Sequence, residues 1–318
     1  MRQPIRVILD CDPGHDDAIA IILAIANVSL DVVAITTVAG NVEVEKTTKN
    51  ALQICEITKA DSIPVVMGTD RPLIGQQMTA VEIHGESGME GPVLPPPIKV
   101  AEKENAVDFI IRVLLESAGD VVLIPTGPLT NIALAIAREP RIKPKIREIV
   151  FMGGGTFGNW TPAAEFNIFV DAEAAKIVME SGVPITMVGL DVTHQVLANK
   201  EIVERYRRIG NPVSLFVSEL LEYFIHTYKI HFNMEGGPVH DACAVAYCID
   251  PSLFATTKVR VDVETKGEFT YGMTVVDLLG VSGRKPNVNF VRTIDVERFW
   301  CLIEDALQSF SIAGATHD

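Results

Sequence analysis

The sequence predicts an α/β fold: an open, mostly parallel sheet with helices on both faces and a small antiparallel edge near the C-terminus. Short, continuous runs of Val, Ile and Leu alternate with helical patterns along most of the chain. This alternation is typical of parallel strands that helices cover on both sides. Near the C-terminus, two β-rich runs at 259–263 and 271–277 follow each other and predict an edge hairpin.

The expected elements follow in order without a linker, a repeat or a low-complexity segment. The predicted strands are 5–9, 32–38, 63–67, 121–124, 149–152 and 185–188. The predicted helices start near Asp16 and then cover 44–58, 105–117, 129–137, 172–180, 199–209, 213–229 and 296–310, with Asn199 as a helix cap. Residues 312–318 are expected to fray. We therefore expect a single domain over residues 1–318.

Composition and charge limit the kind of protein this is. The chain has 318 residues, of which 48% are hydrophobic, enough for a large buried core. Its net charge of -14 comes without a basic patch, which argues against nucleic-acid binding. The five cysteines include no CxxC pair, which fits reduced thiols in the cytoplasm. Since neither a signal peptide nor a membrane span is predicted, we expect a cytoplasmic protein without a membrane partner.

Four carboxylates lie within eight residues, where the first strand meets its helix. They are Asp10, Asp12, Asp16 and Asp17. In open α/β sheets, ligands bind beyond the carboxyl ends of the strands, which is where these acids fall. Helix capping accounts for one or two of them, and a helix N-terminus stabilises each charge by only about 0.3–1 kcal/mol. A bound cation would neutralise them all, and oxygen ligands favour Ca²⁺ or Mg²⁺ over zinc.

A second acidic position is the pair His240-Asp241, which precedes a helical pattern at 242–248. Taken alone, this pair is explained equally well by an N-cap aspartate beside a core histidine. The aromatic stretch from Tyr223 to Phe232 has helical spacing, which is more typical of core positions than of a ligand site.

Several motifs resemble the inosine-uridine-preferring nucleoside hydrolases. Residues 10–17 match the DxDxGxDD signature of that family, and further matches span most of the chain. These are the HGESG loop at 84–88, the TGPLTN turn at 126–131, MGG at 152–154, the AEFN-containing segment at 159–167 and the HD pair at 240–241. The resemblance implies a Rossmann-like nucleoside hydrolase fold.

The resemblance also implies roles for individual residues around a tightly held Ca²⁺. The carboxylates of Asp12, Asp17 and Asp241 and the backbone carbonyl of Thr126 would bind the ion, with Asp10 supporting them. Asp12 would also be the general base for the attacking water, beside Asn41. His240 would face the nucleobase and aid its departure, with a pKa expected to suit neutral pH. The implied ribose ligands are Asp16, Asn159, Glu165 and Asn167. Phe166 is a further substrate-binding residue, and His84 and Tyr228 lie on the base side.

The activity implied by the resemblance is Ca²⁺-dependent hydrolysis of the N-glycosidic bond of a ribonucleoside, giving ribose and a free nucleobase. Uridine and cytidine are the expected substrates, with inosine possible, in nucleoside salvage. The resemblance further implies a homotetramer or a homodimer.

Two alternatives remain open on the sequence. A phosphatase of the haloacid-dehalogenase kind also places DxD after a first strand, but Pro13-Gly14 stands where that family has Thr or Val. A non-catalytic nucleoside-binding protein on the same scaffold is the other alternative. Retention of every implied metal and ribose residue argues against it.

Overall fold

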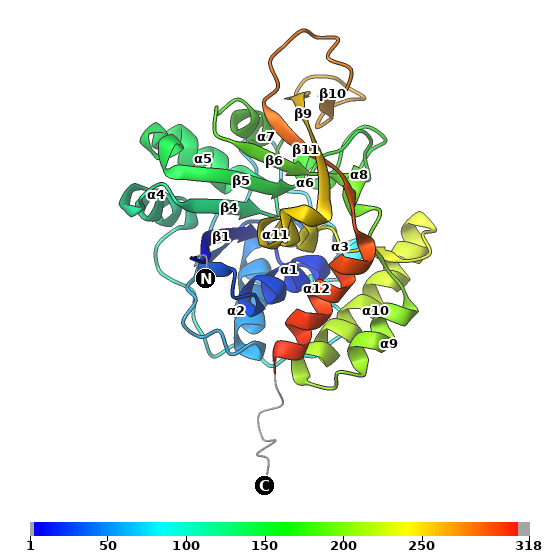
Figure 1. Ribbon diagram of the computed structural model, residues 1–318. Coiled ribbons are helices and arrows are strands. Elements are labelled where there is room, and N and C mark those ends of the chain that lie inside the picture. Colours follow the sequence, from blue (N-terminus) through cyan, green and yellow to red (C-terminus); the bar gives the residue numbers. More distant parts are fainter. Residues whose placement is uncertain (1–2, 311–318) are drawn as a thin grey trace.

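The computed structural model describes residues 3–310 and confirms the predicted fold class. A nine-stranded sheet has the order β10-β9-β11-β6-β5-β4-β1-β2-β3 (Figure 1). Its strands are β1 (Ile5–Cys11), β2 (Leu30–Thr37), β3 (Val65–Met67), β4 (Val121–Pro125), β5 (Ile146–Met152), β6 (Ile185–Val188), β9 (Phe254–Val263), β10 (Thr274–Asp277) and β11 (Val288–Ile294). Strands β7 (Leu197–Ala198) and β8 (Gly237–Pro238) form a separate antiparallel pair. The expected fraying of 312–318 lies outside the described residues.

The six strands predicted from their apolar runs, β1 to β6, pair in parallel. Their central residues are buried because helices cover both faces of the sheet, as the continuous Val and Ile runs indicate. Parallel pairing also places all their carboxyl ends along one edge. The loops that carry the predicted site residues therefore converge there.

The antiparallel edge is larger than predicted. The expected hairpin is confirmed, since β10 pairs with the 260–263 end of β9. Strand β11 was not predicted from the sequence; it lies between β9 and β6, antiparallel to β9 and parallel to β6. Asn289 and Arg292 interrupt its apolar pattern, so its sequence lacks the continuous run of the other inner strands. Strand β9 also begins earlier than expected, through an exposed polar stretch at 255–258.

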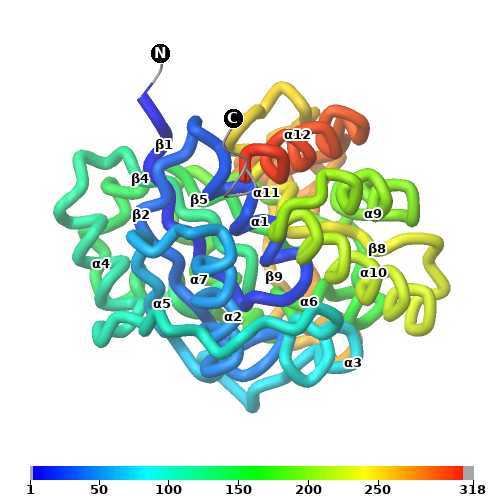
Figure 2. Tube along the Cα trace, turned by 90° about the horizontal axis from the view of Figure 1, so that it is seen from below, coloured from blue at the N-terminus to red at the C-terminus, as the bar shows by residue number. Residues whose placement is uncertain are grey.

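Helices cover the two faces of the sheet as separate layers (Figures 1 and 2). One layer contains α1 (His15–Ala26), α2 (Val44–Ile57), α9 (Lys200–Arg207), α10 (Pro212–Phe232), α11 (Asp241–Ile249) and α12 (Val296–Ser309). The other contains α4 (Ala106–Glu116), α5 (Thr130–Arg138), the 3₁₀ helix η1 (Pro140–Lys145) and α7 (Ala172–Met179). A second 3₁₀ helix, η2 (Pro251–Leu253), precedes β9. Among the described residues, no helix combines the length and apolarity needed to cross a bilayer.

Three helices of one turn or little more were missed by the sequence analysis. They are α3 (Val81–His84), α6 (Phe166–Val170) and α8 (Leu190–Thr193). A 3.6-residue period cannot be recognised over four or five residues, so no pattern predicts them. All three lie in loops around the carboxyl edge of the sheet or beside it.

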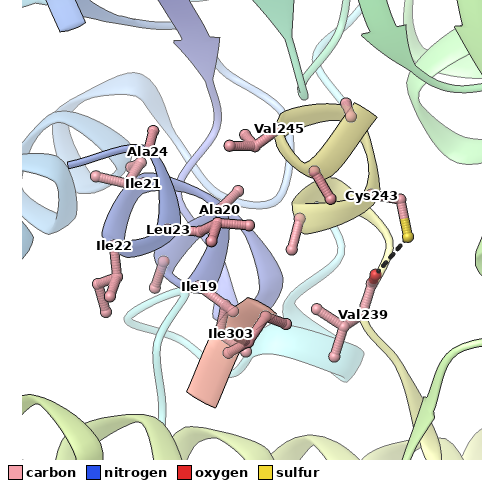
Figure 3. Close-up of a cluster of buried hydrophobic side chains, with 14 of the residues drawn as sticks. Ile19, Ala20, Ile21, Ile22, Leu23, Ala24, Val239, Cys243, Val245 and Ile303 are labelled. Carbon is pink, nitrogen blue, oxygen red and sulfur yellow. Dashed lines mark hydrogen bonds between the residues drawn. The ribbon is translucent and has the colours of Figure 1, made fainter. Parts of the chain in front are cut away.

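The packing of α1, α11 and α12 fixes the geometry near the first strand. Ile19, Val245 and Ile303, one from each helix, belong to a single buried cluster (Figure 3). The thiol of Cys243 donates to the carbonyl of Val239, 3.4 Å away, and thereby closes the start of α11. Burial of these apolar side chains contributes about 1.5–3 kcal/mol each. The same packing holds the first turns of α1 and α11, where acidic residues lie, at fixed positions.

Asn131, at the start of α5, joins the ends of three strands. Its side-chain amide nitrogen donates to Asp10 Oδ1 (2.8 Å) on β1 and to the carbonyl of Thr37 (2.9 Å) on β2. Its amide oxygen accepts from the backbone N–H and hydroxyl of Thr69, just after β3. The side chain is fully buried, so each lost bond would leave an unsatisfied polar group.

We expect Asn131→Ala to lower the free energy of unfolding by about 2–4 kcal/mol, because several buried polar groups lose their partner at once. Urea unfolding followed by circular dichroism measures this loss. Asn199→Ala is the matched control: Asn199 is exposed and caps α9 by accepting from the N–H of Ile202, as predicted. That control should lose only about 1 kcal/mol. If Asn131→Ala lowered the free energy of unfolding by no more than Asn199→Ala does, the proposed role of Asn131 would be contradicted.

Candidate active site

A cavity of about 250 Å³ lies where the strand-end loops converge. All of the predicted site residues except Asp10 and Asp17 line it. The lining residues from the predicted set are Asp12, Asp16, Asn41, His84, Thr126, Asn159, Glu165, Phe166, Asn167, Tyr228, His240 and Asp241. Three further lining residues, on α3 and in the loop before it, were not predicted from the sequence: Ala80, Glu82 and Ile83. No motif marks them, because α3 is too short to have a recognisable pattern.

Three carboxylates form the tightest acidic group in the part of the chain that the structure describes. Oxygen atoms of Asp16, Asp17 and Asp241 all lie within 4.8 Å of one another. The first two are in the first turn of α1, and Asp241 opens α11. Asp12, a predicted metal ligand, lies outside this group, whereas Asp16, a predicted ribose ligand, lies within it.

Burial opposes ionisation of these acids. It raises the pKa of Asp16 to about 7, with the neighbouring charge of Asp17 adding to the effect. Burial likewise raises the pKa of Asp17, and it raises those of Asp12 and Asp241 well above the ordinary value, with further contributions from the charges of the other acids. Within residues 3–310, no Lys or Arg forms a salt bridge with any of these four acids.

The residues present therefore fit a metal ion. The fixed charges of two helix N-termini favour the acids by only about 0.3–1 kcal/mol each, which is small beside the cost of burying several anions. An ion with two positive charges would neutralise them, and an all-oxygen set suits a hard cation such as Ca²⁺ or Mg²⁺.

Asp12 is held rigidly beside the acidic group. Its Oδ2 accepts from the backbone N–H of Asn41 at 2.7 Å, and the Asn41 side chain donates to the Asp12 carbonyl and to Asp17. Two glycines enclose its carboxylate. A Cβ atom on Gly40 would come within 2.1 Å of Oδ2, and one on Gly127 within 2.4 Å of Oδ1. Only glycine at both positions leaves space for this side chain.

Thr126 and Asp10 connect the acidic group to the sheet. The Thr126 hydroxyl donates to Asp17 Oδ1 at 2.7 Å, and its carbonyl accepts from the side chain of Asn167 at 2.7 Å. Asp10 lies at the end of β1, away from the cavity lining, and its Oδ1 accepts from Thr36 and Asn131. Burial raises the pKa of Asp10 to about 6, against the opposing effect of these two hydrogen bonds. This position suits the supporting role predicted for Asp10.

Apart from Asp16 on α1, the predicted ribose-binding side chains come from the loop after β5 and from α6. Glu165 caps α6, accepting from the N–H groups of Asn167, Ile168 and Gly154. Burial raises its pKa to about 7. Asn159 accepts from the N–H of Phe166 at 3.0 Å, which fixes one wall of the cavity.

A second group of lining residues contains His240, Tyr228 and His84. Both ring nitrogens of His240 face hydroxyl groups: Nδ1 lies 2.7 Å from Thr193 Oγ1, and Nε2 lies 3.0 Å from the Tyr228 hydroxyl. Thr193 was not predicted from the sequence. His84 Nδ1 lies 3.2 Å from Nδ1 of the buried His15.

The expectation that His240 has a pKa suited to neutral pH is wrong. Burial lowers its pKa well below the ordinary value, and the charge of His194 adds to the effect. The imidazole is therefore neutral at physiological pH. The aromatic stretch on α10 contains both core residues and cavity-lining residues. Phe224 is buried in a small cluster, whereas Tyr228, His231 and Phe232 line the cavity.

The fold and the site define an α/β protein with a carboxylate-lined cavity, the candidate active site, at the carboxyl edge of a parallel sheet. Comparison with known proteins identifies its family. A model of the inosine-uridine preferring nucleoside hydrolases matches residues 7–301. The pyrimidine-specific ribonucleoside hydrolases RihA of Shigella flexneri and of Escherichia coli O157:H7 are each 47% identical, over 96% of this chain and 99% of theirs.

Comparison with solved structures leads to the same family. The purine-preferring ribonucleoside hydrolase from Gardnerella vaginalis superposes with a TM-score of 0.90 at 33% identity, covering 96% of this chain and 98% of that one. The plant nucleoside hydrolase PpNRh1 gives a TM-score of 0.87 at 31% identity, covering 96% and 99%. The chain belongs to the inosine-uridine preferring nucleoside hydrolase family. It is therefore an enzyme that hydrolyses the N-glycosidic bond of nucleosides, and the phosphatase and non-catalytic alternatives are set aside.

The raised pKa values predict how stability responds to pH and calcium. The folded metal-free protein holds protons on Asp10, Asp16 and Glu165 that the unfolded chain releases at lower pH. The contribution of these three acids to the free energy of unfolding therefore falls as pH rises from about 4 to about 7. Calcium should offset this loss, because it favours the ionised acids.

We expect calcium to raise Tm more at neutral pH than in mild acid, by about 4 °C at neutral pH when the ion is 100-fold above its Kd. Differential scanning calorimetry in calcium-containing and EDTA buffers, repeated across this pH range, measures the difference. A calcium effect that is absent, or that grows as pH falls, would contradict a cation site built from these acids.

Proposed function

We propose that this enzyme hydrolyses pyrimidine ribonucleosides, uridine and cytidine, with inosine as a poorer substrate, and that it requires Ca²⁺. The observation that carries the proposed substrate class is the 47% identity, across nearly the whole length of both chains, to relatives named pyrimidine-specific ribonucleoside hydrolases. The observation that supports the ion is the group of buried carboxylates without a basic partner among residues 3–310.

Asp12, Asp17 and Asp241, with the carbonyl of Thr126, are the proposed ligands of the ion, and Asp16 lies close enough to contact it or the sugar. When bound, Ca²⁺ supplies the positive charge that lets these acids ionise together, and it orients the sugar hydroxyls and a water. Asp10 takes no direct part in this scheme. Its hydrogen bonds to Thr36 and Asn131 keep the end of β1 in place.

Asp12 is the proposed general base. Its carboxylate is buried, lines the cavity and keeps one orientation, because the N–H of Asn41 holds Oδ2 while Gly40 and Gly127 pack against both oxygens. In its ionised form it would take the proton of the attacking water. Asn41 lines the cavity beside it, where the attacking water would lie.

The ribose is proposed to contact Asp16, Asn159, Glu165 and Asn167, all of which line the cavity. Carboxylates and amides bind hydroxyl groups well, and their fixed positions orient the anomeric carbon toward Asp12. Phe166 packs edge-on against Trp160, with ring centroids 5.0 Å apart, and adds an apolar surface to the cavity.

The nucleobase is proposed to lie against His84, Tyr228 and His240. N-glycoside cleavage develops positive charge on the sugar and negative charge on the leaving base. Hydrogen-bond donors on these three side chains stabilise that negative charge. Because His240 is neutral, it contributes here as a hydrogen-bonding group and not as an imidazolium acid.

A single domain over the whole chain is part of the proposal, supported by one family match over residues 7–301. A role in pyrimidine salvage follows from the proposed substrates. Cytoplasmic location and assembly into a homotetramer or homodimer stay predictions.

The substrate proposal predicts the order of kcat/KM over uridine, cytidine, inosine and adenosine. We expect uridine and cytidine to exceed inosine, and inosine to exceed adenosine. Release of reducing sugar measures each rate, with EDTA-treated enzyme and calcium add-back as the metal control. Faster hydrolysis of inosine than of uridine would overturn the pyrimidine preference, and full activity after EDTA treatment would overturn the calcium requirement.

The proposed contacts to the ribose predict discrimination against 2′-deoxyuridine. Removing the 2′-hydroxyl leaves buried polar groups without a partner, so kcat/KM should fall by about 100-fold or more relative to uridine. Competition between the two substrates in one reaction measures the ratio directly. Comparable turnover of both would show that the proposed ribose ligands do not bind this hydroxyl.

A further inference from the structure

His240 is held between two hydroxyl groups that come from different elements. Thr193 is the last residue of α8, one turn beyond the end of β6, and Tyr228 lies in the last part of α10. Thr193 is fully buried, and the other two side chains are 5% exposed. The three groups form one chain of hydrogen bonds, from Thr193 Oγ1 to His240 Nδ1 and from His240 Nε2 to the Tyr228 hydroxyl.

The direction of these hydrogen bonds depends on which ring nitrogen carries the proton, because a neutral imidazole has one N–H and one lone pair. With the proton on Nδ1, the ring donates to Thr193, whose own hydroxyl proton then needs another acceptor. Among the described residues, that hydroxyl makes its side-chain hydrogen bond to His240 alone. An unsatisfied buried donor is unfavourable, so this tautomer is disfavoured.

With the proton on Nε2, the Thr193 hydroxyl and the ring N–H both have acceptors, and the donor left over is the Tyr228 hydroxyl, which lines the cavity as Thr193 does not. The Thr193 hydroxyl donates to Nδ1, and Nε2–H donates to the oxygen of Tyr228. The Tyr228 hydroxyl proton is then not used by His240. Since Tyr228 lines the cavity, this proton is available to a ligand there.

The alternative tautomer would have the opposite effect on the substrate. Tyr228 would donate its proton to Nε2 and present only lone pairs to the cavity. Lone pairs would repel a nucleobase that is gaining negative charge, whereas a hydroxyl donor stabilises it. The identity of the proton-bearing nitrogen of His240 therefore decides whether Tyr228 helps or hinders departure of the base.

We propose that Thr193 is a positioning residue that holds His240 in its Nε2–H tautomer and thereby directs the Tyr228 hydroxyl proton toward the departing nucleobase. The hydroxyl acts as a hydrogen-bond donor and keeps its proton. This inference rests on the proposed function, because it needs a leaving base beside Tyr228. It goes beyond that function by assigning a role to a side chain outside the cavity lining.

Thr193→Val removes the hydroxyl and keeps the shape of the side chain, so it tests the proposal directly. We expect kcat for uridine to fall by about 10- to 100-fold, with KM within about threefold, because the lost donor acts mainly in the transition state. Thr193→Ser keeps the hydroxyl and should stay within about threefold of wild type in both constants. A Val variant with unchanged kcat, or a Ser variant as slow as Val, would overturn the proposal.

The leaving group separates this role from a merely structural one. p-Nitrophenyl β-D-ribofuranoside releases a stable phenolate that needs little stabilisation by a donor. Thr193→Val should therefore lose less than about threefold on this substrate. An equal loss on both substrates would show a general distortion of the site and overturn the proposal. Tyr228→Phe should show the same dependence on leaving group, and adding Thr193→Val to it should cause little further loss.

¹⁵N NMR of histidine-labelled wild-type enzyme tests the tautomer without measuring activity. The His240 signals, assigned by their loss in His240→Asn, should show protonated Nε2 and unprotonated Nδ1. The reverse pattern would overturn the proposal even if the Val variant failed to fold. Wild-type enzyme that hydrolyses no ribonucleoside would overturn the proposed function instead, and the tautomer measurement would still stand as a separate result.

Discussion

The structure depends on the burial of several carboxylates at the point where two helices begin. Asp16 and Asp17 open α1 and Asp241 opens α11, and the apolar packing between these helices prevents the acids from moving apart. Repulsion between their ionised forms is therefore fixed by the fold, and a bound cation would relieve it. Binding of such an ion would then also stabilise the fold.

Polar side chains from distant parts of the sequence keep this charged centre in place. Asn131 joins three strand ends, Asn41 holds the Asp12 carboxylate, and Thr126 connects the acids to Asn167. Each of these groups is buried and hydrogen-bonded, so the network fixes one geometry. Rigid placement of this kind reduces the reorganisation that a reaction requires.

The sequence predicted the parts of this arrangement that are local. Continuous apolar runs identified the parallel strands, and the density of aspartates at 10–17 predicted the buried acidic group. Strand β11 was missed because Asn289 and Arg292 break its pattern, and α3 and α8 are shorter than the period that marks a helix. The pKa of His240 was predicted wrongly because it depends on burial by α8 and α10, which no local pattern reveals. Thr193 was missed for the same reason: its importance comes from a contact 47 residues away in the chain.

Glu165 illustrates a constraint on how such a site can evolve. Both of its oxygens already accept backbone N–H groups that begin α6 and fix the loop after β5. A substitution there would disturb the protein scaffold together with the proposed ribose contact, so this position offers natural selection little freedom. The residues proposed to face the nucleobase are different, since cavity-lining side chains such as His231 and Phe232 lie on the exposed end of α10. We therefore expect related enzymes to diverge in the nucleobase that they accept, while the sugar that they bind stays the same.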